Sequence, residues 1–169
     1  MQVQIIAEAG VNHNGKLEMA IELVDLAIKA GADIVKFQTF TIDELVTKNA
    51  PKANYQSVTT GEDESQLDML QKLTLSFEDF IKIKNYCLEK KIEFLTTSFG
   101  PISTDFISNL ELERFKIPSG EITNYPYLKR FGSYQKPIIL STGMSDMQEI
   151  NDALSVLLSS GMSLEKITL

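Results

Sequence analysis

The chain has 169 residues, of which 43% are hydrophobic, enough to build a sizeable core. Sixteen Lys and Arg against 23 Asp and Glu give a net charge of -7, which argues against nucleic acid or an anionic membrane surface as a general partner. The first residues lack a basic leader, and no apolar run reaches the roughly 18 residues of a membrane-spanning helix. We therefore expect a cytoplasmic protein, and Cys87, the only cysteine, fits that reducing compartment as a core residue.

Strand-like and helix-like patterns alternate along the chain. Runs rich in apolar and β-branched residues predict strands over residues 3–7, 33–39, 92–100, 114–117, 136–144 and 167–169. Apolar residues at helical spacing predict helices over 16–30, 64–73, 76–91 and 103–109, a helix from 124, and another that starts at 145 or 146 and ends at Gly161. Residues 41–61 show no sustained period and predict a long loop, a kind of segment that is usually functional or mobile.

Several residues mark the element ends. Gly31 is placed to close the first helix, and Ser76 with Asp79 three positions later is typical of a helix N-terminus. The sustained β-α alternation predicts an α/β fold with a parallel sheet and right-handed crossovers. Polar residues follow every strand, which favours a (β/α)8 TIM-type barrel over a doubly wound sheet, although that sheet stays an alternative. Such a barrel needs about 250 residues, so this chain would supply only its first five to six β/α units.

One stretch is hard to explain by packing. Residues Arg114-Phe-Lys-Ile-Pro-Ser-Gly-Glu121 form a short strand that breaks at Pro118, which has no N–H to donate. Ser119, Gly120 and Glu121 therefore lie just past the strand's carboxyl end. In parallel α/β proteins the loops at that end build the functional site, whereas the plain alternative is a surface turn with a solvated lysine.

The residues at the other strand ends are of the same kind. Together the strand ends and the loops after them supply Glu8, Lys36, Gln38, Thr96, Thr97, Ser98, Lys116, Ser119, Glu121, Ser141 and Thr142. Ammonium groups and short hydroxyls suit a small phosphate or carboxylate. We expect Lys36 and Lys116 to bind one small anion, since a shared ligand would relieve the repulsion between them. Glu8 and Glu121 could act as acid or base or could orient a polyol.

Each of these residues could instead have a purely structural role, with no part in a functional site. Either lysine could extend to solvent, and Glu8 could cap a neighbouring loop. His13, the only histidine, is expected to be a loop hydrogen-bonder rather than a catalytic base, and no metal-site spacing is found in the sequence.

Five blocks carry a resemblance to a known family. They are Ile-Ile-Ala-Glu8-Ala-Gly-Val-Asn-His-Asn-Gly15, Val-Lys36-Phe-Gln38-Thr, Phe-Leu-Thr-Thr97-Ser-Phe, Phe-Lys116-Ile-Pro-Ser119-Gly-Glu121 and Leu-Ser141-Thr-Gly-Met144. In this order they resemble the N-acetylneuraminate (sialic acid) synthase family, including its legionaminate, pseudaminate and spore-coat polysaccharide relatives. The resemblance covers essentially the whole chain.

The resemblance implies a transferase of carbohydrate and polysaccharide biosynthesis. Such an enzyme condenses phosphoenolpyruvate with an N-acylated amino sugar of the N-acetylmannosamine type, which gives a nine-carbon 2-keto acid and phosphate. By resemblance, Gln38 reaches the sugar, Glu8 and Glu121 lie near the reacting centres, and the 41–61 loop borders the sugar pocket. The residues that would hold phosphoenolpyruvate are Lys36, Thr97, Lys116, Ser119 and Ser141.

The resemblance also implies features beyond this chain. The family uses Mn2+ or Mg2+, but its metal-binding histidines come from later strands, so we expect no metal ligand among these residues. A C-terminal antifreeze-like domain that completes the site in a swapped homodimer is also absent. We therefore expect residues 1–169 to be the N-terminal portion of a phosphoenolpyruvate-condensing barrel that is inactive or nearly so by itself.

Two other functions fit the residues. Lys116 could form a Schiff base in an aldolase barrel if its pKa were lowered by its neighbours. Alternatively, the chain could be a non-catalytic module that binds an anion or a sugar acid.

Overall fold

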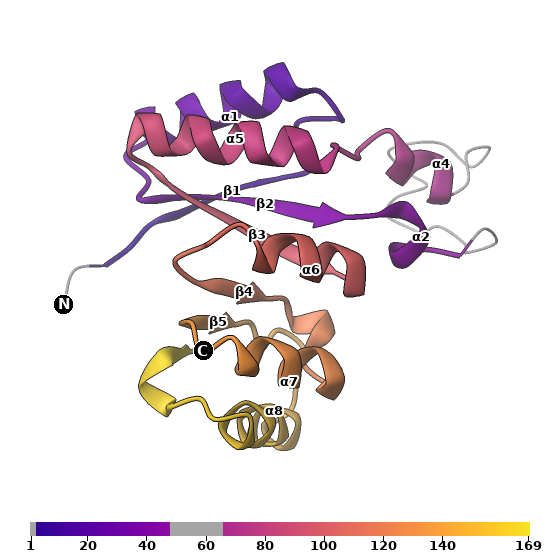
Figure 1. Cartoon of the computed structure of the whole chain (residues 1–169), viewed down its shortest axis with the longest axis vertical. Coiled ribbons are helices and arrows are strands. Elements are labelled where there is room, and N and C mark those ends of the chain that lie inside the picture. The colour runs from indigo at the N-terminus through magenta and orange to yellow at the C-terminus, as the bar shows by residue number, and fades with distance from the viewer. Residues whose placement is uncertain (1–2, 48–65) are drawn as a thin grey trace. The chain divides into compact units, whose positions relative to one another are not determined.

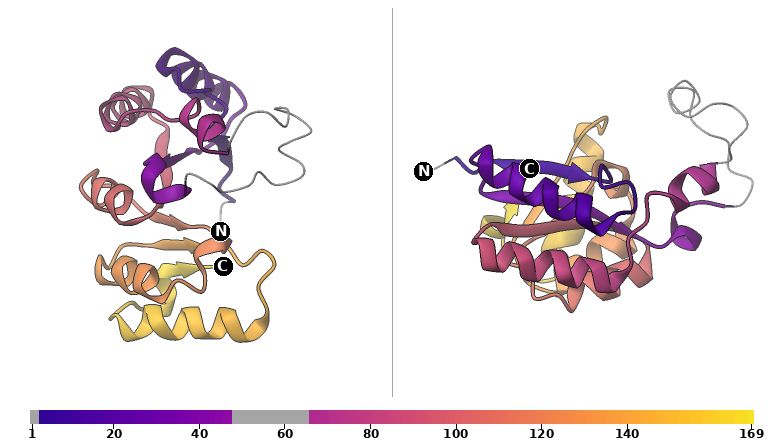
Figure 2. Two further views of the ribbon diagram at one scale, coloured as in Figure 1. Left: turned by 90° about the vertical axis from the view of Figure 1, so that its right-hand side faces the viewer. Right: turned by 90° about the horizontal axis from the view of Figure 1, so that it is seen from above.

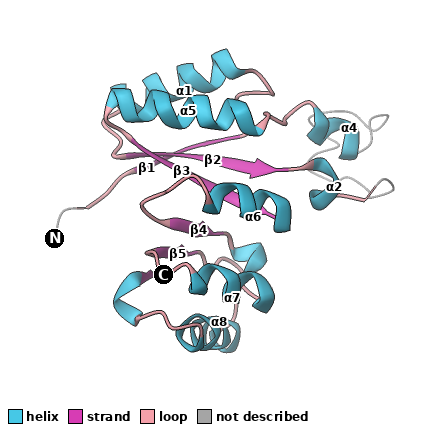
Figure 3. Ribbon diagram, viewed as in Figure 1, coloured by secondary structure: helices cyan, strands magenta, loops and turns pink. Residues whose placement is uncertain are grey.

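The computed structural model describes residues 3–47 and 66–169, in which parallel strands alternate with helices (Figures 1 and 3). The strands are β1 (Ile6–Gly10), β2 (Ile34–Phe40), β3 (Glu93–Phe99), β4 (Phe115–Ile117), β5 (Ile138–Leu140) and β6 (Ile167–Thr168). The helices are α1 (Leu17–Lys29), α2 (Ile42–Leu45), α4 (Gln66–Gln71), α5 (Phe77–Lys90), α6 (Pro101–Ser108), α7 (Tyr125–Ser133) and α8 (Met147–Ser159). Among the described residues, no helix combines the length and apolar character needed to span a membrane.

The chain divides into two compact units, which are described separately. The first comprises Met1–Phe94 with Ser98–Phe106, and the second comprises Leu95–Thr97 with Ile107–Leu169. One three-stranded sheet has the order β1-β2-β3 and the other has the order β4-β5-β6. β1 pairs with β2, β4 with β5 and β5 with β6 in parallel. Each order is sequential, which agrees both with a barrel and with either half of a doubly wound sheet. The predicted α/β class with parallel strands is confirmed, whereas closure into a barrel stays a prediction.

In the first unit, helices α1 and α5 lie side by side along one face of the sheet (Figures 1 and 2). Ala20, Val24 and Ala27 form the buried stripe of α1, and small residues at this spacing let the helix approach the strands closely. On the sheet, the ring of Phe37 stacks on that of Phe94 with centroids 5.8 Å apart. This packing fixes β2 and β3 relative to each other.

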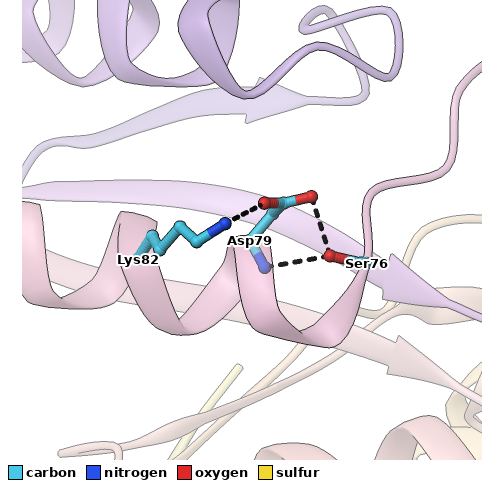
Figure 4. Close-up of polar contacts among 3 residues, drawn as sticks. All are labelled: Ser76, Asp79 and Lys82. Carbon is cyan, nitrogen blue, oxygen red and sulfur yellow. Dashed lines mark hydrogen bonds and ion pairs between the residues drawn. The ribbon is translucent and has the colours of Figure 1, made fainter.

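Helix α5 begins where the sequence predicts. The Ser76 hydroxyl accepts a hydrogen bond from the Asp79 backbone N–H at 3.1 Å and donates to the Asp79 carboxylate at 2.7 Å (Figure 4). The Lys82 ammonium donates to the same carboxylate at 2.9 Å. The hydrogen bond from Ser76, followed by that from Lys82, lowers the pKa of Asp79. The predicted N-cap is therefore confirmed, and it satisfies one of the helix's first free N–H groups.

The second unit is built around aromatic side chains. Phe115 of β4 meets Phe131 of α7 edge to face with centroids 5.0 Å apart, and both rings also contact Tyr134. Helix α7 packs against α8, which begins with a capping box between Asp146 and Glu149. The predicted caps at 124 and 146 are confirmed, and Gly161 follows α8 with a left-handed φ of +93°.

Some predicted boundaries were wrong. The first strand starts at Ile6 rather than at residue 3 and continues through Glu8 to Gly10. Lys36 and Gln38 lie inside β2 rather than at or past its end. A short helix, α2, occupies the start of the predicted 41–61 loop, and most of that loop lies outside the described residues. Alternation alone does not reveal where strand pairing stops, because polar side chains on one face are compatible with a longer strand.

The contact between α7 and α8 predicts the effect of a substitution at Gly132. A Cβ at this position would lie 2.6 Å from Ser160 Cβ and 3.1 Å from Ser160 Oγ. Because Ser160 Cβ is attached directly to the backbone, the backbone of α7 or of the end of α8 would have to shift. We expect Gly132→Ala to lower the free energy of unfolding by about 1–3 kcal/mol, measured by urea denaturation. Gly120→Ala is the control, because a Cβ there meets nothing within 4 Å. A stabilised Gly132→Ala variant would contradict this account of the helix pair.

Candidate functional site

Glu8 and Lys36 form one polar group in the first unit. They are partners in the parallel register of β1 and β2, and the Lys36 ammonium makes an ion pair with Glu8 Oε2. The Lys36 side chain is only 12% exposed, whereas that of Glu8 is 50% exposed. The exposed carboxylate of Glu8 therefore neutralises the largely buried ammonium of Lys36. The structural interpretation of Lys36 as a solvated lysine is wrong.

Gln38 lies next to this pair. Gly10 ends β1 with a φ of +55°, and a Cβ there would lie 3.3 Å from Glu8 Oε1 and 3.6 Å from Gln38 Nε2. The register between β1 and β2 shifts between Glu8 and Gly10, and the side chains of Glu8 and Gln38 both approach the glycine. The first unit thus brings a carboxylate, an ammonium and an amide together at neighbouring strand positions.

Lys116 and Ser141 form the corresponding group in the second unit. The Lys116 ammonium donates to Ser141 Oγ at 2.6 Å and to the Ile117 carbonyl at 2.9 Å. Ser141 follows β5, and its backbone N–H donates to the Ile117 carbonyl at 3.0 Å, which extends the strand ladder by one residue. An ammonium and a hydroxyl held together in this way can both bind the oxygens of an anion.

A cavity of about 370 Å³ lies in the loops after β4 and β5, and neither Lys116 nor Ser141 is among its lining residues. Its lining residues are Ser119, Gly120, Ile122, Thr123, Gly143, Met144, Ser145 and Glu149. The loops are in close contact here, since a Cβ on Gly143 would lie 3.4 Å from Ser119 Oγ. Met144 has a left-handed φ of 60° and a fully exposed side chain. Backbone strain of this kind is found at functional loops, and the periodicity of the sequence did not single this residue out.

The other predicted site residues have defined surroundings. The Glu121 carboxylate accepts a hydrogen bond from Asn124 Nδ2 at 2.6 Å, next to the N-terminus of α7. Thr97 is 2% exposed and lies inside β3 between two further buried hydroxyl residues, Thr96 and Ser98. These hydroxyls therefore lie inside the strand, close to its carboxyl end, rather than in the loop after it.

Lys36 belongs to the first unit and Lys116 to the second. The structure thus assembles two polar groups, Glu8 with Lys36 and Gln38, and Lys116 with Ser141. That both lysines bind one anion stays a prediction. The ion pair between Glu8 and Lys36 was missed, because it depends on strand register, and register is not visible in a single strand's pattern.

His13 and Cys87 are both fully buried, so neither side chain is exposed to a substrate. Among the described residues, His13 Nδ1 accepts the Gly15 N–H at 3.1 Å, while Nε2 has no partner. Burial lowers the pKa of His13, so the ring is neutral near pH 7. The prediction of a loop hydrogen-bonder is confirmed. Burial raises the pKa of Cys87 to about 12, so this thiol is a core group and not a nucleophile.

The described part of the chain contains no group of three or more His, Cys, Asp or Glu side chains that could hold a metal ion.

Comparison with known proteins gives consistent matches. The profile of the NeuB family matches residues 23–169. The N,N'-diacetyllegionaminic acid synthase of Campylobacter jejuni is 49% identical over 165 residues, which are 98% of this chain and 49% of that protein. The enzyme of the same name from Legionella pneumophila is 51% identical over 150 residues, covering 89% of this chain and 42% of that protein. The chain thus spans about half the length of these relatives.

A solved structure agrees with these matches. The crystal structure of N-acetylneuraminic acid (sialic acid) synthetase from Leptospira borgpetersenii, in complex with citrate, superposes with a TM-score of 0.82 at 26% identity. The alignment covers 96% of this chain and 52% of that one. The arrangement of strands and helices described above is therefore also found in a synthetase of known structure.

The buried His13 predicts a pH dependence of stability. Its folded-state pKa lies below the ordinary value of 6.5, so between those two values only the unfolded chain takes up the proton. Stability should therefore be constant above about pH 6.5 and fall below it, by at most about 1.4 kcal/mol per pH unit. Urea denaturation from pH 8 to pH 5 measures this slope. Because the sequence has 1 His, His13→Gln should abolish the slope between pH 5 and 6.5, and an unchanged slope would refute the assignment.

Proposed function

The chain belongs to the NeuB family, and from this premise we propose that the full-length protein condenses phosphoenolpyruvate with an N-acylated amino sugar. The products would be a nine-carbon 2-keto acid and phosphate. The observation that carries this proposal is the grouping of Lys116 with Ser141 at the carboxyl ends of β4 and β5. Both residues lie in blocks that resemble the phosphoenolpyruvate-binding motifs of the family.

Phosphoenolpyruvate is a compact polyanion, and the Lys116 group suits it. The Lys116 ammonium already donates to two oxygens, Ser141 Oγ and the Ile117 carbonyl, so it is held in position before any ligand arrives. A bound phosphate or carboxylate would exchange such neutral acceptors for charged ones, which form stronger hydrogen bonds. Ser119, beside Gly143 at the cavity, would supply a further donor, and Lys36 and Thr97 are proposed to complete the site.

The proposed reaction forms one carbon–carbon bond and replaces the C2–oxygen bond to phosphate with a C2–oxygen bond from water. The π electrons of phosphoenolpyruvate attack the sugar's aldehyde carbon from the methylene carbon, and the aldehyde oxygen takes a proton to become a hydroxyl. Water adds to the electron-poor C2 carbon and loses one proton, which leaves a hydroxyl on C2. Phosphate then leaves C2 with the bonding electrons, and the hydroxyl gives up its proton as the ketone forms. Glu8 and Glu121 are the proposed proton carriers, since carboxylates within reach of the reacting atoms can serve as general acid and base.

The sugar is proposed from the relatives. The two relatives compared above are N,N'-diacetyllegionaminic acid synthases, 49% and 51% identical to this chain. Phosphoenolpyruvate contains no nitrogen, so both acylamino groups of such a product come from the sugar. We therefore propose a sugar with two acylamino groups, and Gln38 is the residue proposed to contact it. An amide side chain can both donate to and accept from an acylamino group.

The remaining features stay proposals for the full-length protein. They are closure of the strands into a (β/α)8 barrel, assembly as a homodimer, and use of a divalent Mn2+ or Mg2+ ion held by residues outside the described part of the chain. Residues 1–169 alone are proposed to be inactive or nearly so.

The function is tested by phosphate release from the full-length protein. We expect release only when phosphoenolpyruvate and a diacetamido aldose are both present, in step with a 2-keto acid detected by mass spectrometry. Lys116→Met should lower kcat/KM about a hundredfold, because a hydrogen bond to a charged group contributes roughly 1.5–3 kcal/mol. Lys129→Met is the matched control, since Lys129 is an exposed lysine of α7 in the same unit.

Two outcomes would identify the other functions. A Schiff-base aldolase would give an adduct on Lys116 when borohydride is added with pyruvate, whereas the proposed synthase gives none. A non-catalytic module would bind phosphoenolpyruvate in the calorimeter and release no phosphate with any amino sugar. Either result in the full-length protein would replace the synthase proposal.

A further inference from the structure

Glu44 joins two segments that are far apart in the sequence. Its carboxylate accepts hydrogen bonds from the Ile102 N–H at 2.5 Å and from the Ser103 N–H at 3.2 Å, at the start of α6. It also accepts one from the Thr41 hydroxyl at 2.8 Å, directly after β2. Glu44 lies in α2 and is half-buried. One side chain thus connects the segment after β2 to the segment after β3 within the first unit.

The start of α6 is built to receive this carboxylate. Pro101, the first residue of the helix, has no N–H, so Ile102 and Ser103 provide the first available donors. A negative charge here is also favoured by the positive end of the helix dipole. Gly100 leaves room for it: a Cβ at Gly100 would lie 2.7 Å from both Cβ and Cδ of Glu44.

The segment that Glu44 contacts is itself held firmly. Ser103 Oγ donates to the Phe99 carbonyl at 2.7 Å and accepts the Phe99 N–H at 3.2 Å. Thr104 Oγ1 donates to the Gly100 carbonyl at 2.7 Å and lies 2.9 Å from Ser98 Oγ. These hydroxyls tie the start of α6 to the end of β3. Glu44 therefore contacts a fixed support rather than a mobile loop.

On the side of β1, the end of β2 lacks the strand partners that its middle has. The register with β1 ends at Phe37, which pairs with Gly10, and Lys36 is also held by its ion pair with Glu8. Gln38 lies beyond the last register partner of β1, in the part of β2 that leads into Thr41 and Glu44. A change at Glu44 should therefore displace Gln38 and leave Lys36 in place.

We propose that Glu44 is a positioning residue that holds the end of β2, and with it Gln38, against the start of α6, and so sets the affinity for the amino sugar. The assignment of the sugar rests on the function proposed above, in which Gln38 contacts the sugar. Glu44 itself touches neither substrate in this proposal. Glu44 affects the reaction only by setting the position of the end of β2.

Two variants disturb the contact from opposite sides. Glu44→Gln keeps the size of the side chain but replaces one acceptor oxygen with an NH2 group that cannot accept an N–H. Gly100→Ala introduces a Cβ at the position of Glu44, on a backbone with a φ of +97°. The matched control is Gly31→Ala, which has a similar φ of +78° but no atom within 4 Å of the new Cβ. It reproduces the backbone strain without the collision.

The first measurement is steady-state kinetics of the full-length protein with each substrate varied in turn. Glu44→Gln and Gly100→Ala should raise the KM for the amino sugar about tenfold, less than the roughly hundredfold loss that a 1 Å misplacement can cause. The KM for phosphoenolpyruvate should stay within about twofold of wild type, and Gly31→Ala should change neither constant. Equal changes in both KM values, or no change in either, would overturn the proposal.

The second measurement is amide hydrogen exchange of the same proteins without substrate. If Glu44 holds β2, exchange in Glu44→Gln should be faster both at residues 38–40 and at Ile102 and Ser103. Faster exchange at Ile102 and Ser103 alone would make Glu44 a helix cap only and would overturn the proposal.

If the wild type releases no phosphate with both substrates, the assigned function and the sugar assignment fall together. The exchange data still decide whether Glu44 holds β2.

Discussion

In-register pairing of parallel strands places every polar group described here. Side chains at the same level of neighbouring parallel strands point to the same face, and Glu8 and Lys36 are such partners. One further ladder bond, from the Ser141 N–H to the Ile117 carbonyl, holds Ser141 level with the end of β4. The Lys116 ammonium can then reach the Ser141 hydroxyl. A slip of one residue in either pair would turn the side chains of one strand to the opposite face and separate the residues of that group.

The two lysines are each held by contacts with neighbouring residues. Lys36 is nearly buried and is paired with a carboxylate, and Lys116 donates hydrogen bonds to a hydroxyl and a carbonyl. A buried cation without a counter-charge is costly, so Glu8 stabilises β2 when no substrate is bound. In the proposed reaction, an anion that binds to Lys36 would compete with Glu8 and release its carboxylate. A carboxylate released in this way could accept a proton.

The sequence predicted the elements well and the contacts between them poorly. Ser76, Asn124 and Asp146 mark helix starts through local chemistry, and the structure places caps at all three. The bounds of β1 were wrong, and Lys36 and Gln38 were assigned to the end of β2 rather than to its interior, because polar residues on one face of a strand look the same as residues beyond its end. Glu44 was not singled out, since a glutamate in a polar segment has no local feature that reveals Ile102 as its partner. Its role depends on tertiary placement, which a single sequence pattern does not contain.

The central proposal is that Lys36 and Lys116 bind the same small anion in the full-length protein. Calorimetric titration of phosphoenolpyruvate into the full-length protein tests it directly, with Lys36→Met, Lys116→Met and the exposed-lysine control Lys129→Met. We predict one binding site in the wild type and a loss of affinity of about tenfold or more for each of the first two variants, with none for the control. Unchanged affinity in either Lys36→Met or Lys116→Met would show that the two ammonium groups serve different partners and would contradict the account.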